Sequence, residues 1–298
     1  MIEAMSLTKR FGSATAVADV SFRCEPGTLT GFVGPNGAGK STTLRMICGL
    51  ARPDSGTSQI DGVPFAELRN PMRTVGALLE ATALHPGRSG LATLKRACSL
   101  ADMPDERPEE LLRLVGLEPA AWTRRVGDYS LGMRQRLGIA QALVGDPRIL
   151  ILDEPANGLD PEGIRWMRSL LRDFADRGGT VLLSSHLLAE VQATVDRLVV
   201  IGGGRIVASG GLDELLQGSG TLVRAHDMPA LEGALRTAGT GFARREDGAL
   251  SVDAGAEDVG LIALRAGVAL TELREADGGD LEDLFFTLTG GEPLKVAA

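Results

Sequence analysis

The feature that most constrains this chain is the run Gly34-Pro35-Asn36-Gly37-Ala38-Gly39-Lys40-Ser41. It fits the pattern G-x-x-x-x-G-K-[ST], in which a glycine-rich turn leads from a strand into a helix. Residues 29–33 before it are predicted to form a strand, and a helix is predicted from about Lys40 to Gly49. The glycines let backbone N–H groups surround phosphates, and the N-terminal end of the helix attracts negative charge. The sequence therefore predicts a phosphate-binding loop, in which Lys40 contacts the outer phosphates and the Ser41 hydroxyl binds Mg²⁺.

Two acids follow a continuous apolar run further along the chain. Residues 149–152 suit a strand that is buried on both faces, and Asp153 and Glu154 come directly after it. Two acids at a strand end more often belong to a turn, but open α/β sheets bind their ligands at the carboxyl ends of the strands. Together with the phosphate loop, Asp153 is expected to hold Mg²⁺ and Glu154 to orient the attacking water of a phosphoryl transfer.

The order of predicted elements indicates the fold class. Apolar runs at 180–183 and 198–201 predict two further buried strands, whereas residues 86–125 and a segment from Ser130 have helical patterns. Strands that alternate with helices predict an α/β fold with a mainly parallel sheet.

A change of composition at 217–220 marks the expected linker to a smaller C-terminal region. There we predict a strand at 221–225, a helix at 230–238 and a strand at 249–252. A final helix is expected at 281–288, with four apolar side chains on one face.

Composition excludes several classes of protein. The net charge is −8 and no cluster of Lys and Arg is present, which argues against a nucleic-acid partner. Cys24, Cys48 and Cys98 have no metal-ligand spacing, so we expect buried thiols and neither a disulfide framework nor a zinc site. No signal peptide and no apolar run of about 20 residues is found, so another chain is expected to cross any membrane involved.

The sequence resembles the ATP-binding cassette (ABC) family in the order of its motifs. After the phosphate loop come Tyr129-Ser130-Leu131-Gly132-Met133, the acids at 153–154, Asp160 and His186. This resemblance implies the P-loop NTPase fold of ABC ATPases, which is an α/β fold with a mixed, mainly parallel sheet and an inserted helical subdomain. It implies an ABC domain at 1–217 with the helical subdomain at about 80–145, and a small α+β domain at 218–298. ATP and Mg²⁺ are the implied cofactors.

The resemblance also implies roles for single residues. Phe11 would stack on adenine, although a core phenylalanine is the alternative. Ser130 and Gly132 would contact the γ-phosphate of ATP bound to a second subunit, and Asp160 would couple the two sites. Glu154 and His186 are the expected catalytic residues, with His186 sensing the γ-phosphate. The expected nucleotide-binding residues are Phe11, Gly34, Pro35, Asn36, Gly37, Ala38, Gly39, Lys40, Ser41, Thr42, Glu80, Ser130, Gly132 and Asp160, and the expected metal ligands are Ser41, Glu80 and Asp153.

Two positions depart from the family pattern. Leu131 stands where the signature has glycine, which would alter how closely the backbone approaches the phosphate. Glu80 stands where the family has glutamine, so it would add negative charge near the γ-phosphate and bind metal more tightly, or it is an ordinary exposed acid. These departures, with residues 129–136 and the tail at 281–290, are similar to the branch of bacterial ABC ATPases related to bacitracin and other drug exporters.

The resemblance therefore implies the ATP-hydrolysing subunit of a bacterial-type ABC exporter, with a drug or antibiotic as its cargo. It would act as a homodimer or pseudo-dimer at the cytoplasmic face of the membrane, with a separate polytopic permease docked near residues 80–100. The alternatives are a soluble ABC ATPase without a transport role and an importer ATPase. A regulatory module without turnover is disfavoured, because Lys40, Asp153, Glu154 and His186 are all present.

Overall fold

The structure is a computed structural model, and it describes residues 1–80, 83–186, 188–216, 221–245 and 248–275. The chain divides into two compact units, one made of residues 1–210 and a second that begins at Gly211. Each unit has its own hydrophobic core.

A six-stranded sheet forms the centre of the first unit, and its strands run in the order β5-β6-β7-β3-β8-β9. The neighbouring pairs from β5 through β8 are all parallel, which confirms the predicted parallel sheet. β6, β7 and β3 are buried along almost their whole length, as the apolar residues in them predict. The strands are β3 (Leu29–Val33), β5 (Val75–Leu78), β6 (Ile149–Asp153), β7 (Thr180–Ser185), β8 (Arg197–Gly202) and β9 (Arg205–Gly211).

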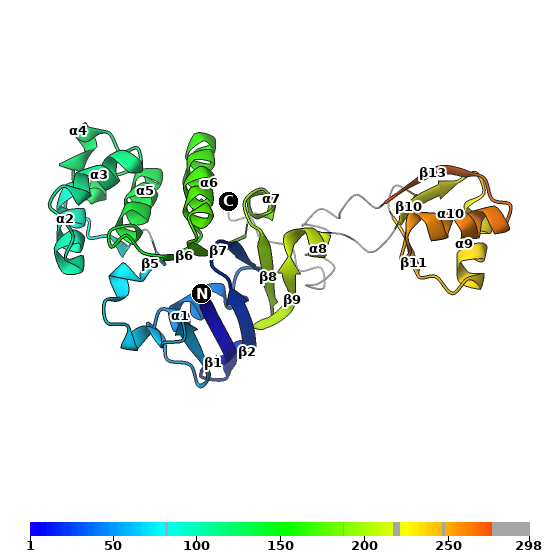
Figure 1. The fold of residues 1–298 in the computed structure, drawn as a ribbon, viewed down its shortest axis with the longest axis horizontal. Coiled ribbons are helices and arrows are strands. Elements are labelled where there is room, and N and C mark those ends of the chain that lie inside the picture. Colours follow the sequence, from blue (N-terminus) through cyan, green and yellow to red (C-terminus); the bar gives the residue numbers. More distant parts are fainter. Residues whose placement is uncertain (81–82, 187, 217–220, 246–247, 276–298) are drawn as a thin grey trace. The chain divides into compact units, whose positions relative to one another are not determined.

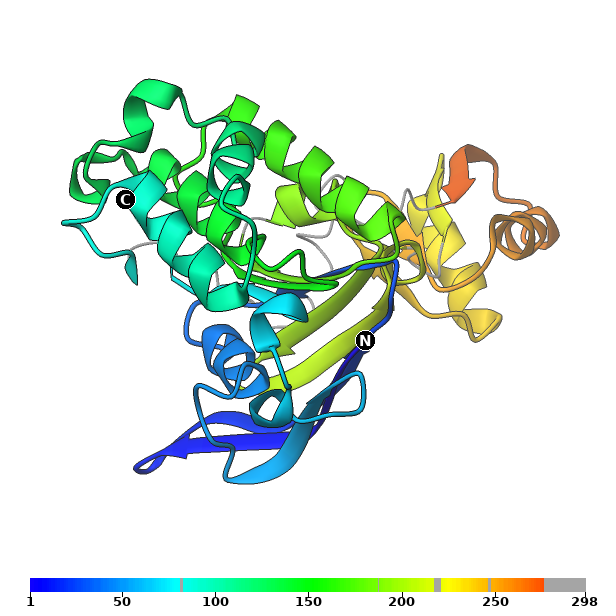
Figure 2. The same ribbon diagram turned by 60° about the vertical axis from the view of Figure 1, so that its left-hand side comes forward.

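A second sheet of three antiparallel strands has the order β2-β1-β4, and its strands are β1 (Ile2–Phe11), β2 (Ala14–Cys24) and β4 (Ser55–Ile60). The rings of Phe22 and Phe32 stack at 5.2 Å between centroids, which joins this sheet to the parallel one. Helix α1 (Lys40–Ile47) contacts both sheets and follows directly from the glycine-rich loop. Figure 2 shows the blue antiparallel sheet on one side of the parallel strands and the green helices on the other.

Helices fill the stretch between β5 and β6, as the sequence predicts. They are α2 (Gly90–Ala101), α3 (Arg107–Leu114), α4 (Pro119–Trp122) and α5 (Leu131–Ala142), and they gather at one end of the parallel sheet (Figure 1). Leu94, Leu111 and Leu137 are fully buried where α2, α3 and α5 meet. Helix α6 (Pro161–Asp176) packs on β7 and β3, and the short α7 (Leu188–Gln192) leads into β8.

The second unit has an α+β fold, as expected, and begins with the short α8 (Leu212–Leu216). Its four strands form an antiparallel sheet in the order β11-β12-β10-β13. The predictions at 221–225, 230–238 and 249–252 are confirmed within two residues, whereas the expected linker and the helix at 281–288 lie outside the described residues. The elements are β10 (Thr221–Ala225), α9 (Met228–Thr237), β11 (Phe242–Arg244), β12 (Leu250–Val252), α10 (Ala256–Arg265) and β13 (Leu270–Glu275).

Candidate nucleotide site

The glycine-rich loop connects the carboxyl end of β3 to the N-terminus of α1. Two of its glycines are required by close packing. A Cβ at Gly34 would overlap the carbonyl oxygen of Ile201, and one at Gly39 would overlap that of Ala16. Gly39 also has φ of 105°, which disfavours other residues. The loop is therefore held tightly against β8 and β2 while its backbone leads into the helix.

Lys40 is almost completely buried at the start of α1, with an exposed fraction of 6%. Its Nζ donates hydrogen bonds to the carbonyl oxygens of Gly34, at 2.7 Å, and Pro35, at 3.3 Å. Burial lowers the pKa of the Lys40 ammonium, while Glu154 and Asp153 oppose that shift. The cation thus sits inside the loop, where it can exchange carbonyl contacts for phosphate oxygens.

Asp153 ends β6, and its carboxylate accepts a hydrogen bond from the hydroxyl of Ser184 on the adjacent strand β7. The same Ser184 oxygen accepts a hydrogen bond of 3.0 Å from the backbone N–H of Glu154. Ser184 is fully buried. It therefore fixes both acids relative to β7.

Glu154 has φ of 50°, in the left-handed region that a non-glycine residue rarely adopts. Backbone strain of this kind clusters at functional sites. Its carboxylate lies between two groups that other segments supply: Oε2 is 2.7 Å from Nδ1 of His186, and Oε1 is 3.9 Å from Nζ of Lys40. The sheet order β6-β7-β3 places the ends of these three segments side by side.

The N-terminus of α5 contacts the loop that precedes α6. Ser130 caps α5 by accepting a hydrogen bond of 3.2 Å from the N–H of Met133. A Cβ on Gly132 would come within 2.7 Å of the carbonyl oxygen of Gly158, and one on Gly158 would overlap Leu131. Leu131, which stands where the family signature has glycine, therefore packs against Gly158 of its own chain.

Asp160 caps α6, because its Oδ1 accepts a hydrogen bond of 2.9 Å from the N–H of Gly163. Gln135 joins α5 to the segment after β6, since its Nε2 donates to the carbonyl oxygens of Pro155, at 2.9 Å, and Glu154, at 3.2 Å. Gln135 is 3% exposed, and the sequence alone did not single it out as a site residue. The two helices thus position the segment that carries Glu154.

Comparison with known proteins decides the family. Residues 17–157 match the protein family described as ABC transporter. An uncharacterized ABC transporter ATP-binding protein of Bacillus subtilis, YhcH, is 41% identical over 214 residues, which cover 70% of this chain and 68% of that protein. The chain belongs to the ABC transporter family of ATP-binding proteins.

Two further similarities describe this ABC ATPase. The bacitracin transport ATP-binding protein BcrA of Bacillus licheniformis is 38% identical over 218 residues, covering 72% of this chain and 71% of that protein. A solved structure of the ATP binding subunit of an ABC transporter superposes with a TM-score of 0.66 at 30% identity, covering 72% of this chain and 91% of that one. The protein is therefore an ATP hydrolase of the cassette type, and its fold is that of the ABC ATPases.

Two further predicted residues of the ABC ATPase lie at the ends of other strands. Phe11 ends β1 and its side chain is 57% exposed, so the alternative of a core phenylalanine is wrong. The Nζ of Lys9 lies 5.6 Å from the centre of its ring. Glu80 follows β5 and is exposed. Stacking on adenine by Phe11 and metal binding by Glu80 both stay predictions.

Metal binding by the ABC ATPase depends on more than its side chains. Within the described ranges, no group of three or more His, Cys, Asp and Glu side chains could hold a metal ion. Mg²⁺ keeps several waters and combines one or two carboxylates with substrate phosphates, so a site of this composition fits that ion in the presence of nucleotide. Ser41 and Asp153 would supply the protein oxygens, and both predicted roles are unchanged by the structure.

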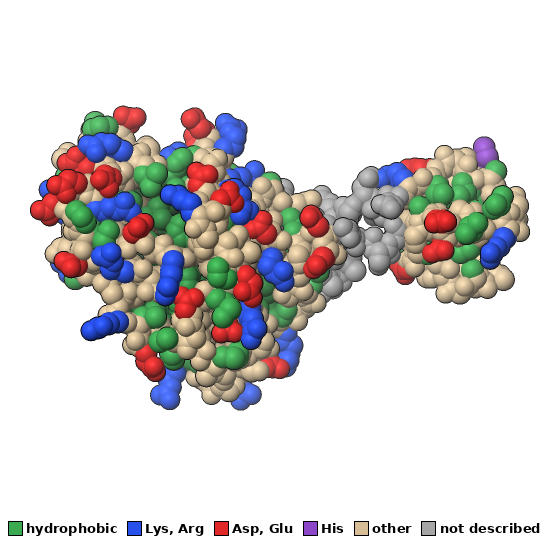
Figure 3. All heavy atoms as spheres, viewed as in Figure 1, with side chains coloured by type: hydrophobic (Ala, Val, Ile, Leu, Met, Phe, Trp, Pro, Cys, Tyr) green, Lys and Arg blue, Asp and Glu red, His purple; other side chains and the backbone are tan. Residues whose placement is uncertain are grey.

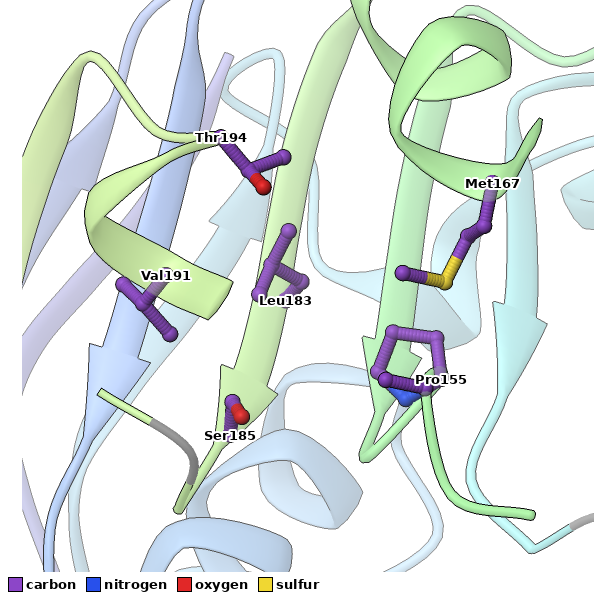
Figure 4. A pocket seen from close by; sticks show the side chains of 7 residues that line it. Pro155, Met167, Leu183, Ser185, Val191 and Thr194 are labelled. Atoms are coloured by element: carbon purple, nitrogen blue, oxygen red, sulfur yellow. The ribbon is translucent and has the colours of Figure 1, made fainter. Parts of the chain in front are cut away.

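A small cavity lies beside the site but does not hold nucleotide. It is lined by five apolar residues and by the hydroxyl-bearing Ser185 and Thr194 (Figure 4). The apolar residues come from the segment after Glu154 and from α6, β7 and α7. Its volume is about 10 Å³, enough for one water at most. This cavity is therefore too small for a nucleotide, and nucleotide binding at the glycine-rich loop stays a prediction.

Proposed function

We propose that this ABC ATPase powers export through a separate transmembrane subunit, with two ATPase chains binding two Mg²⁺-ATP between them. The observation that carries the proposal is the meeting of Lys40, Glu154 and His186 within contact distance at the ends of neighbouring segments. In the part of the chain that the structure describes, no helix is long and apolar enough to cross a bilayer. A separate subunit would therefore have to form the path for the cargo.

ATP binding begins at the glycine-rich loop. The phosphates take the place of the carbonyl contacts of Lys40, and backbone N–H groups at the start of α1 face them. Ser41 and Asp153 would hold Mg²⁺, which would supply positive charge to the phosphates. Ser184 holds the Asp153 carboxylate in place for this contact.

Hydrolysis requires an oriented water, and Glu154 is placed to supply the orientation. Its carboxylate is held from one side by His186 and faces the Lys40 cation on the other. With Nδ1 protonated, His186 donates to Glu154 and fixes the direction of that carboxylate. His186 would then report the presence of the γ-phosphate to Glu154 through this hydrogen bond.

A second chain completes each nucleotide site in this proposal. Ser130 and Leu131 are exposed at the N-terminus of α5, where the helix end favours an anion. Ser130 and Gly132 would face the γ-phosphate bound to the other chain, with Asp160 between the two sites. ATP thereby becomes part of the dimer interface, so its binding and hydrolysis close and open the pair.

The cargo class and direction of transport rest on similarity. The name of BcrA says that it serves bacitracin transport, and this chain covers 71% of that relative. We propose a drug or antibiotic as the exported substrate, which the transmembrane subunit selects. Residues around 80–100, which include most of α2, would contact that subunit at the cytoplasmic face of the membrane.

Purification of the tagged protein from its native membranes in mild detergent tests this proposal. We expect a polytopic membrane protein to accompany it in stoichiometric amount. Inside-out vesicles containing both proteins should then take up cargo with ATP, whereas an importer would not accumulate it in this orientation. Only soluble partners in several mild detergents would contradict the transport role and favour an ABC ATPase that acts in solution.

A further inference from the structure

The C-terminal unit has a free sheet edge. Its strands run in the order β11-β12-β10-β13, so β13 has a described neighbour on one side alone. Val223, Leu250 and Val252 point to the core beneath α9 and α10. An edge strand leaves alternate N–H and C=O groups without a partner in the sheet, which is a template for pairing with another strand.

Apolar side chains line this same edge. Leu273 on β13 is 40% exposed, and Leu261 and Leu264 on α10 are 43% and 75% exposed. A Cβ on Gly260 would lie 3.4 Å from Cδ2 of Leu273, which places this flank of α10 beside β13. Leu264 is one helical turn from Gly260 and therefore lies on the same flank. Hydrophobic side chains gather over α10 on the visible face of this unit (Figure 3).

Charged side chains alternate with Leu273 along the strand. Glu272 and Arg274 lie on the sheet face opposite to Leu273, because successive strand residues point to opposite faces. Glu272 accepts a hydrogen bond of 3.0 Å from Nε of Arg224 and one of 2.8 Å from Nε of Arg274. The edge therefore carries one acid and one base, at positions symmetric about Leu273.

We propose that β13 pairs antiparallel with β13 of a second copy of this chain, centred on Leu273, so that two four-stranded sheets join into one. In this register Leu273 faces Leu273 of the second copy, and the flanking Leu264 side chains are brought toward each other. Glu272 faces Arg274 of the second copy, and Arg274 faces its Glu272. Both cross-strand pairs are of opposite charge, which stabilises a sheet.

Neighbouring registers are less favourable. Centring the pairing on Glu272 would place two glutamates directly opposite, and centring it on Arg274 would place two arginines opposite, and both arrangements are destabilising. A shift of one residue in pairing would move side chains to the wrong face of the sheet. A strand that complements itself in one register fits an isologous two-fold contact better than it fits an unrelated strand. The inference does not depend on nucleotide or on the proposed transport role.

Cysteine cross-linking in the full-length chain tests the register. A disulfide captures the pair covalently, so it detects an interface that is only one strand long. In Leu273→Cys, the two introduced thiols would have Cβ atoms about 5 Å apart, as directly opposed strand residues do. In the control Thr271→Cys, each thiol would lie roughly 13 Å from its counterpart, at about 3.4 Å per residue. Cys24, Cys48 and Cys98 are buried, so they should add little background.

Under mild oxidation without nucleotide, we expect a disulfide-linked dimer of Leu273→Cys and no more dimer for Thr271→Cys than for the unmodified chain. Equal yields for the two variants would overturn the register. If Leu273→Cys cross-links in cell extract to a different protein and never to itself, the edge serves another partner and self-pairing is wrong.

Charge reversal in the Leu273→Cys background gives a second, independent test. Glu272→Arg alone and Arg274→Glu alone each place like charges opposite, so each should form roughly ten-fold less linked dimer. Mixing the two variants places the two arginines of one chain opposite the two glutamates of the other, and the linked heterodimer should return to the original yield. Circular dichroism melts establish that both variants are folded. Folded variants that fail to recover the dimer on mixing would contradict the proposed pairing.

Discussion

Oε2 of Glu154, which follows β6, lies 2.7 Å from Nδ1 of His186, which follows β7. The other carboxylate oxygen of Glu154 lies 3.9 Å from Nζ of Lys40. One side chain therefore links the glycine-rich loop, the acidic strand end and the histidine after β7. A shift of any one of these three segments would therefore change the contacts of the Glu154 carboxylate.

Replacement of His186 by alanine removes the group that fixes the Glu154 carboxylate. We expect ATP turnover to fall by about a hundred-fold, a typical effect for a group that assists proton transfer or orients a catalytic carboxylate. ATP binding, measured by fluorescence of a nucleotide analogue, should change little. His226→Ala, at an exposed position in the C-terminal unit, is the matched control and should keep full turnover. Full activity of His186→Ala would contradict its placement in the catalytic cluster.

Lys40→Ala removes the buried cation of the phosphate loop. We expect loss of measurable ATP binding by calorimetry, because the Lys40 ammonium inside the loop is the cation that would contact the phosphates. Lys95→Ala, on the exposed face of α2, should bind ATP normally. Unchanged binding by Lys40→Ala would show that the nucleotide site lies elsewhere.

Ser184→Ala tests a residue that motif reading does not identify. Its hydroxyl holds Asp153 and the backbone of Glu154, and the fully buried site cannot replace it with bulk water. Loss of such a buried hydrogen-bonding group costs about 1–3 kcal/mol of unfolding free energy. We also expect a higher Mg²⁺ concentration for half-maximal turnover, which a purely structural defect would not produce. Ser169→Ala, at an exposed position on α6, should change neither quantity.

Gly158→Ala separates backbone strain from packing. Gly158 and Gly178 have φ of 76° and 88°, but a Cβ would overlap Leu131 only at Gly158. We expect Gly158→Ala to cost about 2 kcal/mol more than Gly178→Ala in urea unfolding, because overpacking adds to strain. Leu131→Ala in the same chain should recover most of that difference. Equal costs at the two glycines would mean that Leu131 does not pack against Gly158.

The buried cysteines predict a pH-dependent reactivity. Burial raises the pKa of the Cys24 and Cys48 thiols to about 12, so both thiols are protonated at pH 8. The thiolate is the reactive form. With a pKa of about 12, roughly one thiol in ten thousand is ionised at pH 8. Iodoacetamide should therefore leave both residues unmodified in the native protein at pH 8, and it should modify them after unfolding. Rapid native labelling, read by peptide mass spectrometry, would contradict the packing of β2 and α1.

Motif spacing in the sequence is enough to predict that Lys40, Glu154 and His186 lie near one another, as they do in the structure. Lys40, Asp153, Glu154 and His186 each follow a predicted strand, and a parallel sheet brings such ends to one edge. Ser184 and Gln135 were missed because their roles come from contacts with a neighbouring strand and a distant loop, which no local pattern records. The packing of Leu131 on Gly158 was missed for the same reason, since the two residues belong to different segments.

The C-terminal unit shows a different limit of sequence reading. Its strand at 221–225 was predicted from composition and periodicity, because burial against α9 and α10 requires apolar residues there. The order of the strands in the sheet could not be predicted, because it depends on which strands pair with one another in the folded unit. The free edge of β13 is visible only once that order is known.

Glu154→Gln, incubated with ATP and Mg²⁺, tests the central claim most directly. The amide keeps the shape of the side chain but cannot act as the carboxylate that activates water. We expect tight ATP binding, very slow hydrolysis and a dimer that depends on ATP and is stable in size-exclusion chromatography with light scattering, whereas the unmodified chain hydrolyses its ATP and loses this ATP-dependent dimer. A Glu154→Gln chain that forms no additional dimer with Mg²⁺-ATP and hydrolyses it at the normal rate would contradict the account.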